Sequence, residues 1–228
     1  MKLSGIQKLT LLDFPGKVAC TLFTPGCNFR CPFCHNASLV FSCVQNITEE
    51  EVLSFLKKRV GILDGVCITG GEPLLQKDIA VLLAQIKALG FLVKLDTNGA
   101  FPERLEPLLV EKLVDYVAMD IKAGRRNYHT AIGLPTVDLD SIERSVTLLK
   151  TSGVDHEFRT TTVKGIHSMK DFEDIAVWLA GEEKYYIQQY TPSDDMIGEP
   201  FAQFDKTELE AFANVVRQTV NTVELRGI

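Results

Sequence analysis

Three cysteines stand close together in the segment 24–36, which reads Thr-Pro-Gly-Cys-Asn-Phe-Arg-Cys-Pro-Phe-Cys-His-Asn. Cys27, Cys31 and Cys34 have the spacing Cys-x3-Cys-x2-Cys, and thiolates are ligands for zinc and for iron–sulfur clusters. Three thiolates can hold an iron–sulfur cluster and leave one iron without a protein ligand. Because such an iron can bind a substrate, the first interpretation of this segment is a reactive iron–sulfur site.

Zinc is the second interpretation. A structural zinc ion prefers four protein ligands, so the fourth would come from His35, Cys20 or Cys43. No second Cys or His pair stands at a matching spacing, which argues against zinc. Outside the triplet, Cys20, Cys43 and Cys67 lie in apolar stretches, and we expect them to be buried thiols that bind nothing.

Two further interpretations use only part of the triplet. Cys31-Pro-Phe-Cys34 is typical of a glutaredoxin-type redox pair, but that reading gives Cys27 no role. Cys31-x-x-Cys34-His35 formally matches a c-type haem attachment, which the lack of an export signal disfavours. The residue spacing by itself leaves these alternatives to a cluster open.

Polar residues follow other short apolar runs, and their chemistry suits a ligand. Glycines let the backbone approach a ligand closely, and charged side chains bind amino, hydroxyl and carboxylate groups. These segments are Gly70-Gly71-Glu72-Pro73, Asp96-Thr97-Asn98-Gly99, Asp120-Ile121-Lys122, Arg159-Thr160-Thr161 and Gln188-Gln189-Tyr190. Asp120 and Lys122 alternate along a strand end and point to the same side, so they bind a ligand or pair with each other. Arg159 likewise binds a carboxylate or closes a structural ion pair.

The elements that carry these residues alternate between strands and helices. Short apolar runs predict strands at residues 18–23, 65–69, 91–95, 116–119, 157–162 and 185–188. Helical spacing of apolar residues, capping residues and closing glycines predict helices at about residues 48–61, 79–90, 102–112, 140–153, 168–180 and 205–216. This alternation requires parallel pairing, so we predict an α/β fold whose strand ends converge on one site. Alternation alone leaves open whether the sheet closes, curves or lies flat.

Composition and charge restrict the class of protein. The 228 residues, of which 46% are hydrophobic and 24% charged, predict a single domain over residues 1–228 and exclude a disordered or collagen-like chain. The chain has 24 Lys and Arg against 30 Asp and Glu, and the net charge of −6 argues against a broad nucleic-acid or membrane footprint. Neither a membrane span of ~20 apolar residues nor an export signal is apparent, so we expect a cytoplasmic protein.

The motifs resemble those of a known superfamily. Cys-x3-Cys-x-aromatic-Cys after the first predicted strand and Gly-Gly-Glu-Pro after the second are similar to the radical S-adenosylmethionine (SAM) superfamily over nearly the whole chain. Residues 9–17 and the sequence Cys-Pro-Phe-Cys-His-Asn resemble the glycyl radical enzyme activases, first the longer-type activating proteins of anaerobic ribonucleotide reductase and then pyruvate formate-lyase activating enzyme. The resemblance implies a partial, laterally open parallel (β/α)6 barrel.

The resemblance also implies two cofactors. A [4Fe–4S] cluster would be held by Cys27, Cys31 and Cys34, and SAM would be cleaved reductively at that cluster to methionine and a 5′-deoxyadenosyl radical. The residues implied in SAM binding are Phe33, His35, Gly70, Gly71, Glu72, Asp96, Asp120, Lys122 and Arg159.

The implied roles of these residues differ. Phe33 and His35 flank Cys34, where relatives place the adenine, and the carbonyls of Gly70-Gly71 would accept from the SAM ammonium. Glu72 would hold that glycine loop or help to bind the ammonium, and Arg159 would bind the SAM carboxylate.

Two departures from the activase pattern affect these expectations. Activases often carry a histidine near the end of the sixth strand, where this chain has Gln188-Gln189-Tyr190-Thr191-Pro192, so Gln189 or Thr191 is expected to substitute. A second cysteine cluster, which some activases insert ahead of the position of Thr48, is also missing. We therefore expect electrons from a separate flavodoxin or ferredoxin-type donor.

Three functions are compatible with the sequence. The first is an activase that abstracts hydrogen from a glycine Cα of a partner protein, because an open barrel leaves room for a protein loop and the chain has no residues left for a substrate domain. The second is a radical SAM enzyme that acts on a small molecule, as in deazapurine biosynthesis. The third is a non-catalytic iron–sulfur electron carrier or sensor. None of the three involves nucleic acid or a membrane.

Overall fold

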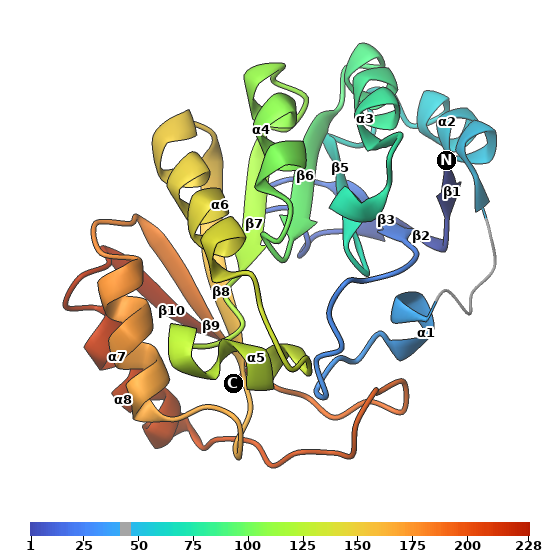
Figure 1. The fold of residues 1–228 in the computed structure, drawn as a ribbon. Coiled ribbons are helices and arrows are strands. Elements are labelled where there is room, and N and C mark those ends of the chain that lie inside the picture. Colours follow the sequence, from blue (N-terminus) through green and yellow to red (C-terminus); the bar gives the residue numbers. More distant parts are fainter. Residues whose placement is uncertain (42–46) are drawn as a thin grey trace. The chain divides into compact units, whose positions relative to one another are not determined.

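The computed structural model describes residues 1–41 and 47–228 (Figure 1). The contacts divide the chain into two compact units. The first unit comprises Met1–Asn28, Ser38–Ala118 and Ser141–Asp155, and the second comprises Phe29–Ala37, Met119–Asp140 and His156–Ile228. The single domain predicted over residues 1–228 stays a prediction, and Cys43 lies outside the described residues.

Parallel strands form the centre of the first unit. β3 (Ala19–Thr24), β5 (Gly65–Gly70) and β6 (Leu92–Thr97) pair in parallel, as predicted from the alternation. Their apolar residues are almost fully buried, which is usual for parallel strands covered on both faces. β2 (Gly5–Thr10) pairs antiparallel with β3, and β1 (Lys2–Leu3) pairs antiparallel with β4 (Ile47–Thr48).

The helices of the first unit begin and end at signals that the sequence contains. α2 (Glu49–Lys57) begins at a capping box in which Glu51 Oε2 accepts from Thr48 N at 2.8 Å. α3 (Ile79–Ala88) is followed by Gly90 in the left-handed region at φ +89°. The remaining elements are α1 (Ala37–Val40), the 3-10 turn η1 (Pro73–Leu75), α4 (Pro102–Val110) and α6 (Leu139–Ser152).

The second unit repeats the parallel arrangement. β8 (Asp155–Thr162), β9 (Lys184–Gln189) and β10 (Thr222–Arg226) pair in parallel. α7 (Met169–Trp178) and α8 (Lys206–Val216) lie side by side, and α8 begins at a capping box between Asp205 and Glu208 (Figure 1). β7 (Tyr116–Asp120) begins in the first unit and ends in the second, followed by the 3-10 turn η2 (Arg125–Asn127) and α5 (Tyr128–Ile132).

The sheet is open. In the part of the chain that the structure describes, β2 and β10 are edge strands, each paired on one side only. The prediction of an α/β fold with a mainly parallel, laterally open sheet is therefore confirmed. Each of the predicted strands and helices is present, with bounds that differ by a few residues.

Among the elements of five or more residues in the described part of the chain, three were not predicted from the sequence. β2 exposes Gln7, Lys8 and Leu9, so it lacks the alternation of a half-buried strand. α5 has five residues, too few for a periodic pattern. β10 reads Thr-Val-Glu-Leu-Arg, and its alternation of polar and apolar residues is a signal that could have identified it.

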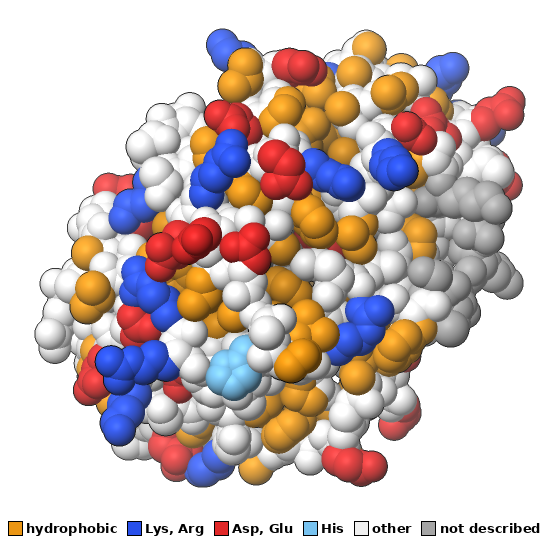
Figure 2. Space-filling view, in the orientation of Figure 1, with side chains coloured by type: hydrophobic (Ala, Val, Ile, Leu, Met, Phe, Trp, Pro, Cys, Tyr) orange, Lys and Arg blue, Asp and Glu red, His pale blue; other side chains and the backbone are white. Residues whose placement is uncertain are grey.

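The surface mixes charges of both signs. Figure 2 shows acidic, basic and hydrophobic side chains interspersed over the face in view. Single exposed apolar side chains are usual on such surfaces. None of the helices within the described residues is both long enough and apolar enough to span a membrane.

Cys20 provides a test of the predicted division between ligand and bystander thiols. It lies fully buried in β3, and burial raises its pKa to about 12. Its thiolate fraction at pH 8 is then about a thousandfold below that of an ordinary thiol, so iodoacetamide is expected to leave Cys20 unmodified in the native apo protein. Mass spectrometry of the labelled peptides checks this result. Cys34, which is half-buried, serves as the reactive control, and labelling of both at similar rates would contradict the prediction.

Candidate functional site

The cysteine loop is divided between the two units. Cys27 belongs to the first unit, whereas Cys31 and Cys34 belong to the second. In the second unit Arg30 N donates to the last carbonyl of α5 at 2.8 Å, and the N–H groups of residues 197 and 198 donate to loop carbonyls at 3.3 and 2.9 Å. These bonds fix the backbone that carries two of the three predicted cluster ligands.

In the first unit a side-chain amide contacts the remaining cysteine. Asn98 Nδ2 lies 3.9 Å from Cys27 Sγ and donates to Asn28 Oδ1 at 2.8 Å. An N–H donor stabilises a thiolate and affects the potential of a bound cluster. Asn98 was predicted to lie at a strand end but without a role, although a polar residue directly after a buried strand was the available signal.

The two glycines after β5 are required by the chain itself. A Cβ on Gly71 would lie 1.8 Å from Gly26 O, and a Cβ on Gly70, which has φ +119°, would lie 2.4 Å from Thr24 N. Gly71 N also donates to Thr24 O at 3.0 Å. The backbone of these two glycines therefore lies close to the backbone at the start of the cysteine loop. Contact of these glycines with SAM stays a prediction.

Glu72 is fully buried and joins the ends of β5 and β6. Its Oε1 accepts from Thr97 Oγ1 at 2.8 Å and from Leu74 N at 3.1 Å, and its Oε2 accepts from Asn98 N at 2.7 Å. Two roles were expected for Glu72, and these hydrogen bonds agree with the one in which it holds the glycine loop. A direct contact with the SAM ammonium stays a prediction.

The replacement Glu72→Gln is expected to destabilise the apo protein by about 2 kcal/mol, because an amide nitrogen would then face a buried donor, either the Asn98 N–H or the Thr97 hydroxyl and Leu74 N–H. Urea unfolding measures the change. Glu106→Gln is the matched control, since Glu106 is 46% exposed and pairs with Arg144 on the surface. Equal stability of the two variants would show that the buried hydrogen bonds of Glu72 contribute little.

A buried lysine accompanies Asp96. Lys94 and Asp96 form an ion pair on β6, with exposed side-chain fractions of 2% and 13%. Cys67, on β5 directly across from Lys94, lies 3.9 Å from both groups. Lys94 was not predicted as a site residue, because a lysine inside an apolar run interrupts the pattern from which the strand is predicted. Its spacing of two residues from Asp96 was the available signal, since it places both on one side of the strand.

Three charged residues of the second unit form one cluster. Asp120 Oδ2 accepts from Lys122 Nζ at 2.8 Å, and Asp120 Oδ1 accepts from Arg159 Nε at 2.5 Å. The pairing considered for Asp120 and Lys122 from their alternation is therefore present, and so is an ion pair of Arg159. All three side chains are between 16% and 24% exposed, so they remain accessible to a ligand.

The electrostatics of this cluster keep its members charged. Burial alone would raise the pKa of Asp120, but the Arg159 guanidinium and the Lys122 ammonium hold that pKa well below its usual range. Burial opposes the charge on Lys122, yet Asp120 and Cys31 hold its pKa above the usual range. Burial, together with Lys122 and Arg159, lowers the pKa of His35. The structure thus brings His35 near the charged cluster, and these surroundings favour its neutral form.

His167 supports the same segment. Its Nδ1 accepts from Val163 N at 3.0 Å, which leaves Nε2–H to donate to Lys122 O at 2.8 Å. Burial lowers the pKa of His167, in keeping with this neutral ring. The ring also packs edge-on against Phe33, with centroids 6.0 Å apart. His167 therefore contacts both Lys122 and Phe33, two residues predicted to bind SAM.

The end of β9 offers one acceptor. Gln189 Nε2 donates to Phe204 O at 2.6 Å, while Gln189 Oε1 is buried and has no hydrogen-bond partner. Thr191 is exposed. Of the two residues expected to replace the histidine of the activases, Gln189 has the buried acceptor that a ligand donor could use.

Within each unit, several of the predicted site residues lie close to one another. In the first unit Glu72 accepts from the backbone N–H of Asn98, whose side-chain amide contacts Cys27. In the second unit His35 lies near the charged cluster. No group of three or more His, Cys, Asp or Glu side chains among residues 1–41 and 47–228 is already arranged around a metal-binding position, and the cysteine triplet has members in both units.

Comparisons of the sequence with known proteins give consistent matches. Residues 21–179 match the family model of the radical SAM superfamily. A Methanocaldococcus jannaschii protein, provisionally named as a glycyl-radical enzyme activating enzyme, is 35% identical over 99% of this chain and 95% of its own length. The pyruvate formate-lyase-activating enzyme of Staphylococcus aureus is 29% identical over 65% of this chain and 64% of its own length.

A comparison of structures agrees on the fold. The structure of Streptococcus suis SuiB bound to the precursor peptide SuiA matches 91% of this chain with a TM-score of 0.71. The two sequences are 15% identical, so this match concerns the fold alone. The chain spans about half, 48%, of the length of SuiB.

Proposed function

Because the chain belongs to the radical SAM superfamily, we propose that it is a glycyl radical enzyme activase, which forms a glycyl radical on a partner enzyme. The observation that carries this proposal is the 35% identity to a protein named as such an activating enzyme, over 99% of this chain and 95% of the relative. The S. aureus pyruvate formate-lyase-activating enzyme supports the same activity. Partners of the anaerobic ribonucleotide reductase or pyruvate formate-lyase type follow from this proposal.

Membership of the superfamily implies SAM and a [4Fe–4S] cluster. The cluster ligands in our proposal are Cys27, Cys31 and Cys34, and the residues around them fit such a group. Three thiols stand within eight residues, and an amide N–H lies beside Cys27 Sγ. When bound, these groups would supply the 5′-deoxyadenosyl radical that takes a hydrogen atom from the partner glycine.

The charged cluster of the second unit would bind and orient SAM. Lys122 and Arg159 present two cations to the SAM carboxylate, and Asp120 keeps both in place while it offers an acceptor to a hydroxyl or ammonium group. Phe33 would contact the adenine from the cysteine loop, where His167 fixes the orientation of its ring.

The first unit also contains groups that suit SAM. Asp96, paired with Lys94, and the Gly70-Gly71 carbonyls are acceptors of the kind that an ammonium or a ribose hydroxyl requires, and Glu72 holds the glycine loop. Electrons would come from a flavodoxin or ferredoxin-type donor, since the triplet is the one cysteine cluster in the sequence.

The activity can be tested in two steps. The anaerobically reconstituted protein, reduced with dithionite and mixed with SAM, is expected to form 5′-deoxyadenosine. With a purified glycyl radical enzyme of either partner type it is expected to give the doublet of a glycyl radical in electron paramagnetic resonance (EPR). The control partner has alanine in place of its radical glycine, and it should give no doublet.

The outcomes separate the candidate functions. Nucleoside formation with no doublet from either partner type would overturn the activase proposal and leave a small-molecule substrate. A retained cluster with no nucleoside would instead indicate an electron carrier. Both results can be obtained on the same protein preparation.

A further inference from the structure

The turn that follows β6 is held in place by hydrogen bonds within the first unit. Glu72 Oε2 accepts from Asn98 N at 2.7 Å, and Thr97 Oγ1 accepts from Gly99 N at 3.1 Å. Ser145 Oγ, on α6, donates to Gly99 O at 2.7 Å. The side chains of Glu72, Thr97 and Ser145 are buried, so water competes little for these hydrogen bonds. The backbone of Asn98 is therefore fixed.

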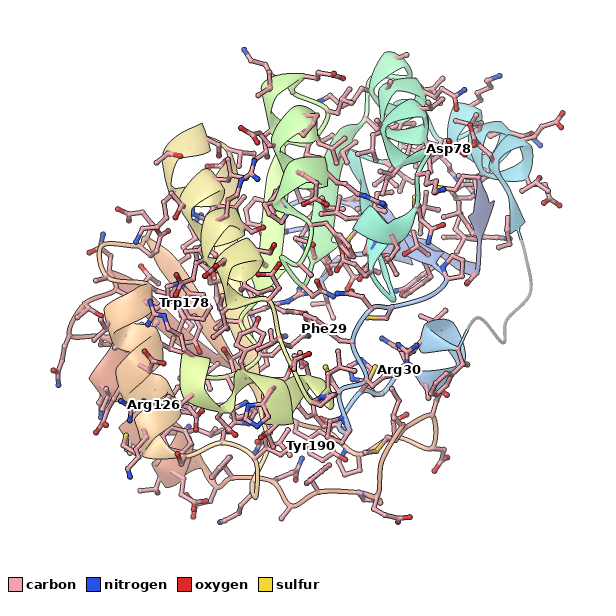
Figure 3. The ribbon with its side chains drawn as sticks, viewed as in Figure 1. Phe29, Arg30, Asp78, Arg126, Trp178 and Tyr190 are labelled. Carbon is pink, nitrogen blue, oxygen red and sulfur yellow. The ribbon has the colours of Figure 1, made fainter. Side chains whose placement is uncertain are left out.

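The side-chain amide of Asn98, which is also buried, has a defined orientation. Its Oδ1 accepts from Ala100 N at 3.0 Å, and its Nδ2 donates to Asn28 Oδ1 at 2.8 Å. Because a backbone N–H requires an acceptor and a carbonyl oxygen requires a donor, these two partners decide which end of the amide carries the nitrogen. Figure 3 labels Phe29, the residue that follows Asn28 on the cysteine loop.

This orientation directs a donor toward Cys27. An amide nitrogen carries two N–H groups, and the one that Asn28 does not use is left for Cys27 Sγ, 3.9 Å from Asn98 Nδ2. A neutral thiol can itself donate toward Asn28 Oδ1, 4.0 Å from Cys27 Sγ. A thiolate has no proton to donate and only accepts, and hydrogen bonds to charged acceptors are shorter and stronger than neutral ones. The Asn98 amide thus suits the charged form of Cys27.

We propose that Asn98 is a positioning residue whose amide donates to the sulfur of Cys27 and raises the reduction potential of the cluster. This inference rests on the proposed function, in which Cys27 is a cluster ligand. Reduction adds negative charge to the cluster, and hydrogen bonds to its sulfurs stabilise that charge. Asn98 therefore makes the cluster easier for the electron donor to reduce.

The variant Asn98→Ala tests this inference without measuring activity. Its cluster, loaded to the wild-type iron content and studied without SAM or a partner enzyme, is expected to be about tenfold harder to reduce, which is ~59 mV for a one-electron couple. The EPR signal of the reduced cluster, recorded at a series of fixed potentials, gives the midpoint.

Asn98→Asp is a second variant with nearly the same shape. It keeps an oxygen that accepts from Ala100 N, but it has an oxygen in place of the nitrogen that donates toward Cys27. Its potential should fall at least as far as that of Asn98→Ala, because the new atom is an acceptor and carries negative charge when ionised.

Asn127→Ala is the matched control. Asn127 belongs to the second unit, and its Nδ2 donates to Ile166 O at 2.6 Å. The control thus removes the same amide group and one of its hydrogen bonds, but from a residue whose amide bonds a backbone carbonyl instead of a predicted ligand. We expect it to melt at a lower temperature than the wild type as apo protein and to keep the wild-type potential when loaded.

Two outcomes overturn the inference. If fully loaded Asn98→Ala keeps the wild-type potential, the amide does not act on the cluster, and Asn98→Asp decides by the same criterion if the alanine variant does not load fully. If Asn127→Ala lowers the potential equally, the shift reflects a general loss of stability. Failure of the wild type to assemble a cluster that depends on Cys27 is a different result, which overturns the proposed function first.

Discussion

Replacement of Cys27, Cys31 or Cys34 with alanine is expected to abolish both cluster assembly and SAM cleavage. Each replacement removes one of the three thiolates, and the remaining two do not satisfy the cluster. The loss should exceed the roughly 10- to 100-fold effect that follows removal of an outer hydrogen-bond partner. Iron and sulfide content, the visible absorption of the reconstituted protein and the yield of 5′-deoxyadenosine measure the result.

Two variants calibrate this experiment. Cys20→Ala removes a buried thiol that is not among the proposed cluster ligands, and whose pKa is raised by burial. This variant should assemble a normal cluster. Asn98→Ala removes the amide beside Cys27 Sγ, and it should give an intermediate loss in the 10- to 100-fold range. Full activity of any variant of the triplet, or loss of the cluster in Cys20→Ala, would exclude the proposed ligand set.

Replacement of Lys94 with methionine is expected to destabilise the apo protein by about 3–5 kcal/mol. The change leaves the Asp96 carboxylate in a site where it is 13% exposed and has lost its cation. Removing one partner of a buried ion pair costs this much because the remaining charge stays largely shielded from water after the opposite charge is gone. Equilibrium unfolding in urea measures the difference, with the protein kept free of cluster and SAM.

Two comparisons make the Lys94 result specific. Arg144→Met breaks the Arg144–Glu106 pair, whose side chains are 54% and 46% exposed, and should cost between about 0 and 1 kcal/mol. The double variant with Asp96→Leu should recover much of the loss, since a buried pair can often be replaced by apolar residues. A loss below about 1 kcal/mol in Lys94→Met would mean that Asp96 is not held by its charge pair.

The positions of the candidate site residues could be predicted from the sequence because parallel strands end at a common edge. Asp96 and Asp120, which directly follow apolar runs, and Glu72, which follows one after two glycines, were found in this way. The hydrogen-bond partners of these residues could be predicted only where the two partners are close together in the sequence. Asp120 and Lys122 pair because they are two residues apart on a strand end.

Contacts between segments that are distant along the chain could not be predicted from the sequence. Glu72 reaches Thr97 and Asn98, and Gly71 passes Gly26, only because neighbouring strands bring these segments together. The helix α5 was not predicted for a related reason, since its five residues carry no periodic signal. Burial of a polar group is a property of the packed chain, so its consequences require the structure.

The two edge strands affect how the protein behaves in concentrated solution. A free sheet edge can pair with the edge of another molecule and start aggregation. β2 exposes Lys8 and β10 exposes Glu224, and charged side chains at an edge discourage such pairing. Arg226, near the end of β10, is held by Glu157 at 2.8 Å, so that edge is also fixed in place. The open sheet is thus combined with protection against the aggregation to which free sheet edges are prone.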